Sequence, residues 1–440
     1  MNRSRLLPAA LVLFINLLGG NAIRGELNLS PSNGDTTSNF TDVVCHEGKM
    51  PDDINSLKNK NMNKENPQYI IHGWESCSQS NRINSDSLQV NTFLIKIDSI
   101  NNMEEGYEAG VSGFYAGVAN GTGIIAGGCN FPVNPLASDS KKKFYKGIYR
   151  IKREGPDEWE PEKLGELPYP MAYGNGVTFP EGLVLMGGAN NSESFDNVFL
   201  LTLENDNDLN ITTLPSLPGK IDNAAATAIG STIYIAGGNV DGKPSNKIFS
   251  LDIKNYNKGW EELPSFPGNP RVQPVMASGI DANGNENIYI WGGFCGKFDG
   301  RDASLETNGL KYDIKTGKWI PVEGPKDENG EDFSIGGGAA TSLEDGRIIV
   351  TGGVNKDIFL EALRNQAPDY LSYPVEWYRF NPYIFIFDPK NEKWKINFAT
   401  PKTARAGAGM LPTGDSKVLV IGGEIKPRIR TAEIFEIDNL

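Results

Sequence analysis

Six times along the chain an apolar run ends in a Gly-Gly pair, and this repetition restricts the possible folds more than any other feature. The pairs lie 50 to 70 residues apart, with second glycines at Gly128, Gly188, Gly238, Gly293, Gly353 and Gly423. A repeat of this length indicates that one supersecondary unit recurs along the chain. The residue after each pair lies where a strand leaves its unit, so we expect these side chains to share one opening. Only the last pair is followed by an acidic residue, Glu424.

Each unit has the pattern of four strands. The first is rich in small residues, the second ends in the Gly-Gly pair, and the third carries an aromatic residue and an aspartate. The fourth often opens with tryptophan, at Trp159, Trp260, Trp319 and Trp394. Small residues suit a crowded innermost strand, and a period near 50 with this signature is typical of kelch-type blades. The pattern predicts an all-β, six-bladed kelch-type β-propeller over residues 106–440.

The last unit has no fourth strand of its own. After KVLVIGGE it has a third strand, Ala432–Leu440, and the chain then ends. A propeller closes its ring, which removes exposed strand edges. We therefore expect a strand from the otherwise polar segment 23–105 to close the last blade, either in NTFLIKID (Asn91–Asp98) or in QYIIHGW (Gln68–Trp74).

The first 22 residues have the pattern of a signal peptide. Arg3 and Arg5 precede the apolar stretch Leu6–Leu18, which is too short to span a bilayer, and small residues follow at Gly20-Asn21-Ala22. No later stretch is apolar enough to cross a membrane. The sequence predicts an exported protein, which would be periplasmic in a Gram-negative bacterium and otherwise secreted.

The four cysteines allow one plausible disulfide. Cys45 and Cys77 both lie in the N-terminal segment, and an exported protein could oxidise them. Cys129 and Cys295 each follow a Gly-Gly pair in blades three apart, so they would face each other across a six-bladed ring. Disulfide Cα atoms lie within about 7 Å, so we expect no bond between these two.

Composition excludes several classes of function. The net charge of −13 leaves no basic surface for a nucleic acid. The only histidines, His46 and His72, precede the repeats, so the ring offers no histidine-ligated metal centre and no Ser-His-Asp triad. No phosphate-binding loop or dinucleotide fingerprint occurs. We expect neither a metal nor a cofactor.

The remaining candidates are carboxylate and guanidinium groups. Glu424 and Arg430 flank one loop of the last unit; a desolvated glutamate serves as a general base, and arginine binds carboxylates with its planar fork. By spacing alone, such a pair is more often a solvated salt bridge. Arg271 and Arg405 begin the first strands of two units, where they either stabilise neighbouring loops or bind an anion.

An insertion from Asn355 to about Pro382 interrupts the fifth unit. Its first part, NKDIFLEALRNQ, has helical spacing, and its second part is aromatic and broken by proline. Long insertions often form lids or binding loops. A lid over the ring and a surface excursion over a neighbouring blade both remain open.

Three motifs of this chain resemble one family. GGVNKDIF (Gly352–Phe359), GGEIKPRIRTAEIFEID (Gly422–Asp438) and FPGNPRVQP (Phe266–Pro274) are similar to segments of the N-acetylneuraminate mutarotases, also called sialic acid epimerases. The resemblance extends from about Tyr115 to the C-terminus. The family usually begins at the blade that starts here near Leu214, so this chain resembles a cyclically permuted branch, an arrangement that a ring tolerates.

The resemblance implies roles for single residues. Glu424 matches the catalytic glutamate and Arg430 its partner arginine, and Asn355 and Arg271 match positions near the pocket. Arg428 stands where the family pattern has a small residue. With Arg405 as a further anion-binding candidate, the expected substrate-binding set is Arg271, Asn355, Arg405 and Arg428.

The implied reaction is the interconversion of the α and β anomers of a small acidic sugar, N-acetylneuraminic acid, without a cofactor. Two alternatives stay open. A propeller of this kind could bind a glycan or a protein partner without turnover, and the substrate could be another acidic sugar. The sequence does not indicate an oligomeric state.

Overall fold

The computed structural model describes residues 89–94, 103–155, 158–204, 208–365, 369–398, 401–414, 417–438 and 440. These residues belong to one unit of the chain. The predicted signal peptide, the cysteine pair Cys45 and Cys77, and the QYIIHGW segment all lie outside the described residues.

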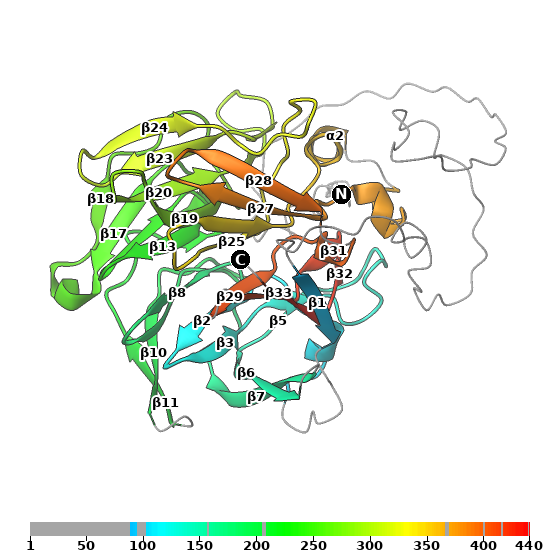
Figure 1. Ribbon diagram of the computed structural model, residues 1–440. Helices are drawn as coiled ribbons and strands as arrows, with labels where there is room; N and C mark the ends of the chain where they lie inside the picture. Colours follow the sequence, from blue (N-terminus) through cyan, green and yellow to red (C-terminus); the bar gives the residue numbers. More distant parts are fainter. Residues whose placement is uncertain are drawn as a thin grey trace, which may run out of the picture. The chain divides into compact units, whose positions relative to one another are not determined.

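Within these ranges the strands form six four-stranded antiparallel sheets, called blades 1 to 6 in the chain order of their innermost strands (Figure 1). Blade 1 contains β2 (Tyr115–Ala119), β3 (Thr122–Ala126), β6 (Gly147–Gly155) and β7 (Glu158–Glu166). Blade 2 contains β8 (Asn175–Phe179), β9 (Gly182–Met186), β10 (Val198–Glu204) and β11 (Asp208–Thr213). Blade 3 contains β13 (Ala225–Ile229), β14 (Thr232–Ala236), β17 (Ile248–Asp252) and β18 (Glu261–Leu263). Blade 4 contains β19 (Val275–Ile280), β20 (Glu286–Trp291), β23 (Gly309–Asp313) and β24 (Lys318–Val322). Blade 5 contains β25 (Ala339–Ser342), β26 (Ile348–Thr351), β27 (Tyr383–Asp388) and β28 (Lys393–Phe398). Blade 6 contains β29 (Gly409–Gly414), β30 (Lys417–Ile421), β33 (Glu433–Asp438) and β1 (Gln89–Leu94). The predicted four-strand unit is confirmed.

The innermost strands form a closed ring. Contacts run from β2 to β8, β13, β19, β25 and β29 in turn, and β29 contacts β2 again. The blades therefore surround one central axis, as Figure 1 shows. The chain is an all-β propeller, as the repeats predicted.

An N-terminal strand completes the last blade. β1 pairs antiparallel with β33, from Gln89 opposite Asp438 to Leu94 opposite Glu433, and the two strands lie side by side in Figure 1. β1 covers the start of the NTFLIKID segment and begins two residues before it. The sequence correctly predicted this closure.

Six backbone hydrogen bonds close a second, smaller ring at the entrance to the innermost strands. One residue of each blade donates its N–H to the carbonyl of its counterpart in the preceding blade, over N···O distances of 2.6 to 2.9 Å. These residues have positive φ angles between 52° and 74°. They are Gly113, Tyr173, Asn223, Gln273, Gly337 and Gly407. We call them the ring residues.

The Gly-Gly pairs join each blade to the next. In blade 5 the φ angles of Gly352 and Gly353 are 71° and 105°, a region that glycine adopts without strain. A Cβ atom on Gly352 would lie 2.2 Å from the carbonyl oxygen of Arg405 in blade 6. The N–H of Gly353 donates to the same oxygen over 3.0 Å. The pair is therefore required by the close approach of a neighbouring backbone.

Three of the four predicted tryptophans bond the outer strands to the preceding blade, whereas the buried indole nitrogen of Trp159 has no hydrogen-bond partner among the described residues. Trp319 in β24 donates its indole N–H to the carbonyl of Pro264 over 2.7 Å, and Trp394 in β28 donates to Glu323 over 3.0 Å. Trp260 bonds Pro215 in the same way over 2.9 Å. These bonds explain the position of tryptophan at the start of the fourth strand.

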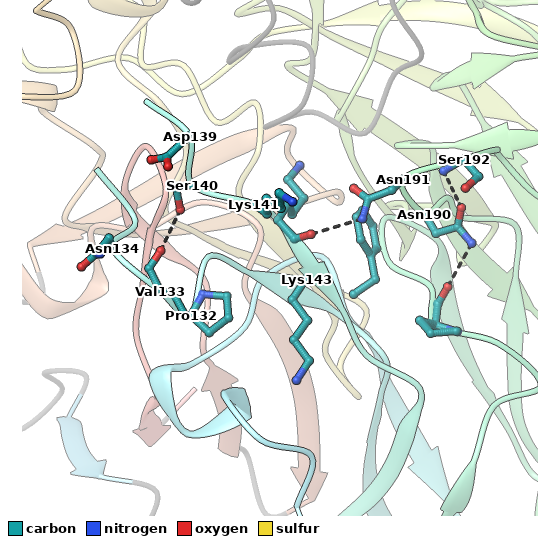
Figure 2. Close-up of a pocket in the computed structure, with 13 residues that line it drawn as sticks. Pro132, Val133, Asn134, Asp139, Ser140, Lys141, Lys143, Asn190, Asn191 and Ser192 are labelled. Atoms are coloured by element: carbon teal, nitrogen blue, oxygen red, sulfur yellow. Dashed lines mark hydrogen bonds between the residues drawn. The ribbon is translucent and has the colours of Figure 1, made fainter. Parts of the chain in front are cut away.

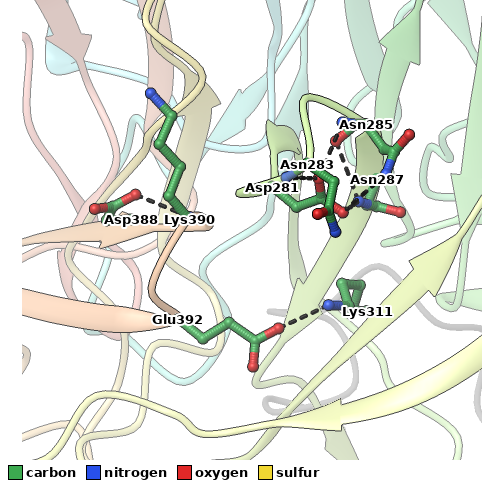
Figure 3. Close-up of polar contacts among 8 residues, drawn as sticks. All are labelled: Asp281, Asn283, Asn285, Asn287, Lys311, Asp388, Lys390 and Glu392. Atoms are coloured by element: carbon green, nitrogen blue, oxygen red, sulfur yellow. Dashed lines mark hydrogen bonds and ion pairs between the residues drawn. The ribbon is translucent and has the colours of Figure 1, made fainter.

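Polar turns join blades 4 and 5 at the end of the strands remote from the Gly-Gly pairs (Figure 3). Asp281 follows β19, and its carboxylate accepts the N–H groups of Asn283 and Asn285 over 2.9 Å each. Lys311 of β23 reaches Glu392 in the β27–β28 turn, with an N···O distance of 2.7 Å. In blades 4 and 5 this end of the strands is therefore formed by structural turns.

Short elements fill the connections between second and third strands and those between blades. The short strands are β4 (Cys129–Asn130), β5 (Lys143–Phe144), β12 (Ile221–Asp222), β15 (Asn239–Val240), β16 (Lys243–Pro244), β21 (Phe294–Cys295), β22 (Ser304–Leu305), β31 (Glu424–Lys426) and β32 (Ile429–Arg430). The helices are α2 (Lys356–Asn365) and the 3-10 turns η3 (Tyr107–Ala109), η4 (Ile253–Lys258), η5 (Val375–Tyr378) and η6 (Pro401–Thr403). None of the helices in the described ranges is both long and apolar enough to cross a membrane. Cys129 and Cys295 are buried free thiols, as expected.

Candidate active site

Glu424 is held at the entrance of the last blade by backbone pairing on both sides. It begins β31 and lies opposite Arg430 of β32 in an antiparallel pair. Its own N–H and carbonyl bond Ala406 over 2.7 and 2.9 Å. Ala406 precedes the ring residue Gly407, so Glu424 lies beside the closed ring.

The side chains of Glu424 and Arg430 form an ion pair between Oε2 and Nη1. The Arg430 side chain is 1% exposed and the Glu424 side chain 16% exposed. The backbone N–H of Arg428 also donates to Oε2 over 3.3 Å. Cross-strand partners project from the same side of a hairpin, which is why a six-residue separation brings the two groups together. The pair is thus largely buried and is not a solvated surface bridge.

Glu424 lines a small central cavity of about 40 Å³. The walls come from the ring, from the residues beside it and from the insertion of blade 5. They are Ser112, Tyr173, Gln273, Val354, Phe359, Tyr370, Phe380, Ala406, Gly407, Glu424 and Pro427. Of the six residues that follow the Gly-Gly pairs, Val354 and Glu424 line this cavity, so the expectation of one opening shared by all six holds for these two.

Four polar residues of this cavity, Ser112, Tyr173, Gln273 and Tyr370, were not predicted from the sequence as site residues. Tyr173 and Gln273 are both ring residues, with φ angles of 63° and 52°. The Gln273 amide donates to the Asn223 side chain over 2.8 Å, and Asn223 in turn donates to the buried carboxylate of Asp222 over 2.8 Å. Alignment of the repeats by their Gly-Gly pairs would have found Tyr173, which precedes Gly187 by 14 residues, as Gly113 precedes Gly127; Gln273 precedes Gly292 by 19 residues and would have been missed.

The hydroxyl of Tyr173 is surrounded by donors. Lys142 Nζ donates to Tyr173 Oη over 2.9 Å, and Cys129 Sγ donates over 3.0 Å. Burial and Cys129 raise the pKa of Tyr173 well above its usual range, whereas the adjacent Arg430 guanidinium lowers it. Burial lowers the pKa of Lys142 to about 7, against the opposing effect of Cys129, and the cations Arg430 and Arg428 lower it as well. Two cations therefore lie close to one phenol at the cavity wall.

Arg428 lies next to the pair but its guanidinium points elsewhere. Its Nη1 donates to the carbonyls of Pro135 and Ala137 over 3.2 and 2.7 Å, and it lies over the Phe131 ring at 4.9 Å. Burial lowers its pKa. In this structure Arg428 fixes the loop of blade 1 and does not line the cavity.

Arg271 and Arg405 occupy equivalent positions, each two residues before a ring residue. Each donates through Nη1 to the carbonyl of the first glycine of its own blade's pair, Gly292 over 3.0 Å and Gly422 over 2.9 Å. Arg405 also forms a 3.3 Å ion pair with Glu433. Their exposed fractions are 2% and 1%. The structure does not bring these guanidinium groups into the cavity. Of the two roles considered for Arg271 and Arg405, loop stabilisation and anion binding, their contacts support loop stabilisation.

Asn355 is the N-terminal cap of α2. Its side-chain oxygen accepts the N–H of Ile358 over 3.1 Å, a typical capping contact. Its neighbour Val354 lines the cavity, whereas Asn355 itself does not. Asn355 therefore sets the direction in which the insertion leaves blade 5.

The insertion forms the roof of the cavity. Phe359 of α2, Tyr370 and Phe380 supply three of its walls. Lys426 of β31 anchors this roof, because its Nζ donates to the carbonyls of Leu371 and Tyr373 over 3.1 and 2.6 Å. Of the two interpretations of the insertion, the structure supports a segment that covers the ring opening.

A larger depression of about 660 Å³ lies between the loops of blades 1 and 2 (Figure 2). Its lining is mostly lysines, amides and prolines, with Asp139 as its acid. Ser140 and Asn191 bond loop carbonyls there, over 2.9 and 3.2 Å. Because Glu424 lines the smaller central cavity and not this depression, we place the candidate chemistry in the central cavity. Across the described ranges no group of three or more His, Cys, Asp or Glu side chains is placed to hold a metal ion.

A family model described as "N-acetylneuraminate epimerase" matches residues 214–439, about half of the chain. The chain belongs to the N-acetylneuraminate epimerase family. The match begins at Leu214, the point at which the resemblance placed the usual start of the family. It includes Glu424, Arg430 and Gln273, and it leaves Tyr173 and Lys142 outside.

Individual relatives have the same name as this family model. The N-acetylneuraminate epimerases of Shigella flexneri serotype 5b (strain 8401) and of Escherichia coli (strain K12) are each 30% identical to this chain over 243 residues. The alignments cover 52% of this chain, which spans 61% of the length of these relatives. A solved structure, "Structure of YjhT", is 29% identical, with a TM-score of 0.43, and covers 51% of this chain and 65% of that chain.

Proposed function

We propose that this protein is a mutarotase that interconverts the α and β anomers of N-acetylneuraminic acid. The observation that carries the proposal is the buried Glu424–Arg430 pair, of which Glu424 lines the central cavity, within the part of the chain that matches the family. The names of the relatives support the choice of sugar. The expected export of the protein fits a substrate that is met outside the cytoplasm.

The reaction requires one proton to leave the anomeric hydroxyl and one to reach the ring oxygen. Glu424 is the general base, because its carboxylate lines the cavity and is largely removed from water. Loss of the hydroxyl proton forms the C2 carbonyl as the bond from C2 to the ring oxygen breaks. Rotation about the adjacent C–C bond and attack of the ring hydroxyl on the other face give the second anomer.

Arg430 has the geometry for the substrate carboxylate and for charge that develops during ring opening. Its guanidinium already binds one carboxylate, that of Glu424, through a single nitrogen, Nη1. A planar guanidinium offers five donors, so its contacts with Glu424 and with the Tyr173 hydroxyl leave capacity for a second anion. Arg430 thus orients the sugar relative to Glu424, and no metal or cofactor takes part in these steps.

Substrate binding requires the roof to move. Cavities that hold small molecules measure roughly 300–1,000 Å³, and the central cavity measures about 40 Å³. Phe359, Tyr370 and Phe380 are the walls contributed by the insertion. Their outward displacement enlarges the cavity without disturbing the backbone ring, so we assign the insertion the role of a lid.

Proton NMR exchange spectroscopy with α- and β-N-acetylneuraminate tests the proposal. Wild-type protein should accelerate anomer exchange above the buffer rate, and Glu424→Gln should reduce the acceleration by roughly 10²-fold or more. The matched control is Glu193→Gln, which removes an exposed carboxylate that pairs with Lys220 and should leave the rate unchanged. Equal rates for wild type, Glu424→Gln and buffer would refute the assignment.

The same assay separates the alternatives. Calorimetric binding of sialic acid without any change in exchange rate would indicate a glycan-binding module. Acceleration with a different 2-keto acid sugar or a uronate, and none with sialic acid, would indicate another acidic substrate. The larger depression, with its lysines and amides, is the feature that favours glycan binding.

A further inference from the structure

The proposed reaction leaves one position unassigned, the group that exchanges a proton with the ring oxygen. Glu424 supplies the base on one side, and Arg430 holds its proton too firmly to act as an acid near neutral pH. The second group has to line the same cavity, carry a proton at neutral pH and have its conjugate base stabilised.

The residues that line the cavity limit which side chain can exchange this second proton. Apart from Glu424, the polar side chains of the lining are Ser112, Gln273, Tyr173 and Tyr370. An amide does not exchange protons as a general acid, and an unassisted alcohol is a much weaker acid than a phenol. The choice is therefore between Tyr173 and Tyr370.

The surroundings of the two phenols differ. Burial and the neighbouring Tyr378 raise the pKa of Tyr370, and its ring packs edge-on against the rings of Trp377 and Tyr378. Tyr173 accepts from Lys142 Nζ over 2.9 Å and from Cys129 Sγ over 3.0 Å, and it also interacts with the Arg430 guanidinium. Burial and Cys129 raise the pKa of the Tyr173 phenol, whereas the Arg430 guanidinium lowers it, because a nearby positive charge stabilises a phenolate.

We propose that Tyr173 is the second catalytic residue, and that its phenol exchanges a proton with the ring oxygen of the bound sugar. The inference rests on the proposed function. In ring opening, Glu424 takes the proton of the anomeric hydroxyl as the C2–O bond breaks, and the ring oxygen takes the proton of Tyr173. In reclosure both protons return, so the enzyme is regenerated without an external reactant.

The backbone explains why a tyrosine can serve here. Tyr173 is a ring residue, and its N–H and carbonyl bond Gly113 and Asn223 over 2.6 and 2.7 Å. These two bonds fix the Cα position, and the Phe144 ring packs edge-on against the phenol at 6.2 Å between centroids. Such fixation favours proton transfer, because reacting groups have to be held in hydrogen-bond range.

Lys142 is a positioning residue for this phenol. It is 9% exposed, and its Nζ lies 4.9 Å from the centroid of the Tyr173 ring. The titratable or charged groups that face Tyr173 are Cys129 from β4, Lys142 before β5 and Arg430 from β32. Each donates to the phenol oxygen or stabilises negative charge on it.

Tyr173→Phe is the first test, measured by NMR exchange at saturating sialic acid. We expect a kcat loss of roughly 10²-fold, with the calorimetric Kd within about twofold of wild type. Tyr169→Phe is the matched control: its hydroxyl bonds Asn197, lies outside the cavity lining and should not affect kcat. A loss in Tyr370→Phe combined with full activity in Tyr173→Phe would overturn the inference.

A second test distinguishes a proton donor from a structural tyrosine. Site-specific replacement of Tyr173 by a trifluorotyrosine lowers the phenol pKa with little change in shape. The alkaline limb of the pH–kcat profile should then move to lower pH. An unmoved profile would overturn the inference while wild-type activity still upholds the proposed function. If wild type itself fails to accelerate exchange, the proposed function fails first, and the inference falls with it.

Discussion

Arg430 donates to the carboxylate of Glu424 across the β31–β32 pair, and the same guanidinium interacts with the hydroxyl of Tyr173. One buried cation therefore links the two groups to which we assign proton transfer. It also connects blade 6, which lies within the family match, to blade 2, which lies outside it. Substitution of Arg430 should consequently affect both binding and chemistry.

Arg430→Met should weaken binding of sialic acid by about 10- to 100-fold, because a charge-assisted hydrogen bond contributes about 1.5–3 kcal/mol. The methyl ester of sialic acid, which has no carboxylate charge, should lose much less affinity on the same substitution. Isothermal calorimetry with both ligands measures the difference, and Arg430→Lys, which keeps the charge but not the fork, should fall between. Equal losses for the acid and the ester would show that the arginine acts only through the fold.

Lys142→Met should stabilise the protein most at low pH. Burial lowers the pKa of Lys142 to about 7 from 10.5, so below pH 7 the folded state holds a buried charge at a cost of at most about 5 kcal/mol. Between pH 7 and 10.5 the unfolded state binds the extra proton, and wild-type stability therefore rises with pH through this window. The difference in unfolding free energy between variant and wild type should shrink from pH 6 to pH 9. A pH-independent difference in urea titrations would contradict the buried-charge interpretation.

Arg405→Met should destabilise the ring without altering substrate affinity. The substitution leaves the carbonyls of Gly422 and Lys402 without this donor and leaves Lys402 as the cation paired with Glu433. Loss of a buried charged partner costs about 3–5 kcal/mol. Thermal unfolding measures the first effect, and calorimetry with sialic acid at a permissive temperature measures the second. A large loss of affinity in a folded variant would restore the anion-binding interpretation.

A chain that begins at residue 101 should unfold at a lower temperature than one that begins at residue 83. The shorter chain lacks β1, so the β33 edge of blade 6 is left unpaired. At about 1 kcal/mol for each backbone hydrogen bond, the loss amounts to several kcal/mol. The longer chain is the control, because it retains β1. Equal midpoints in calorimetric scans would show that β1 does not contribute to the closure of the ring.

Much of the fold could be predicted because the repeat encodes it locally. The Gly-Gly pairs, the small first strands and three of the tryptophans each have a specific contact in the structure, such as the bond from Trp394 to Glu323. The closing strand followed from a count of strands in the last unit. The register of this strand, β1, with β33 could not be predicted from the sequence, because the paired residues lie more than 300 positions apart.

The site was predicted only in part. Glu424 and Arg430 lie where the sequence placed them, and a cross-strand pair accounts for their contact. Arg271 and Arg405 could not be separated from ligand-binding arginines by sequence, because their carbonyl partners are visible only in three dimensions. Tyr173 was missed since its importance comes from the meeting of three blades around its hydroxyl.

The register of β1 against β33 determines how the molecule responds to mechanical force. Gln89 lies opposite Asp438, so the residue at which β1 begins is adjacent to the residue at which β33 ends. A load applied through the chain before Gln89 and after Asp438 would act on one residue pair at a time and peel the two strands apart. Such loading breaks the hydrogen bonds between β1 and β33 one after another and not all at once, so a small force is enough to separate the strands. The blade that carries Glu424 would open first, and stretching would disable the site while the other five blades still hold their sheets.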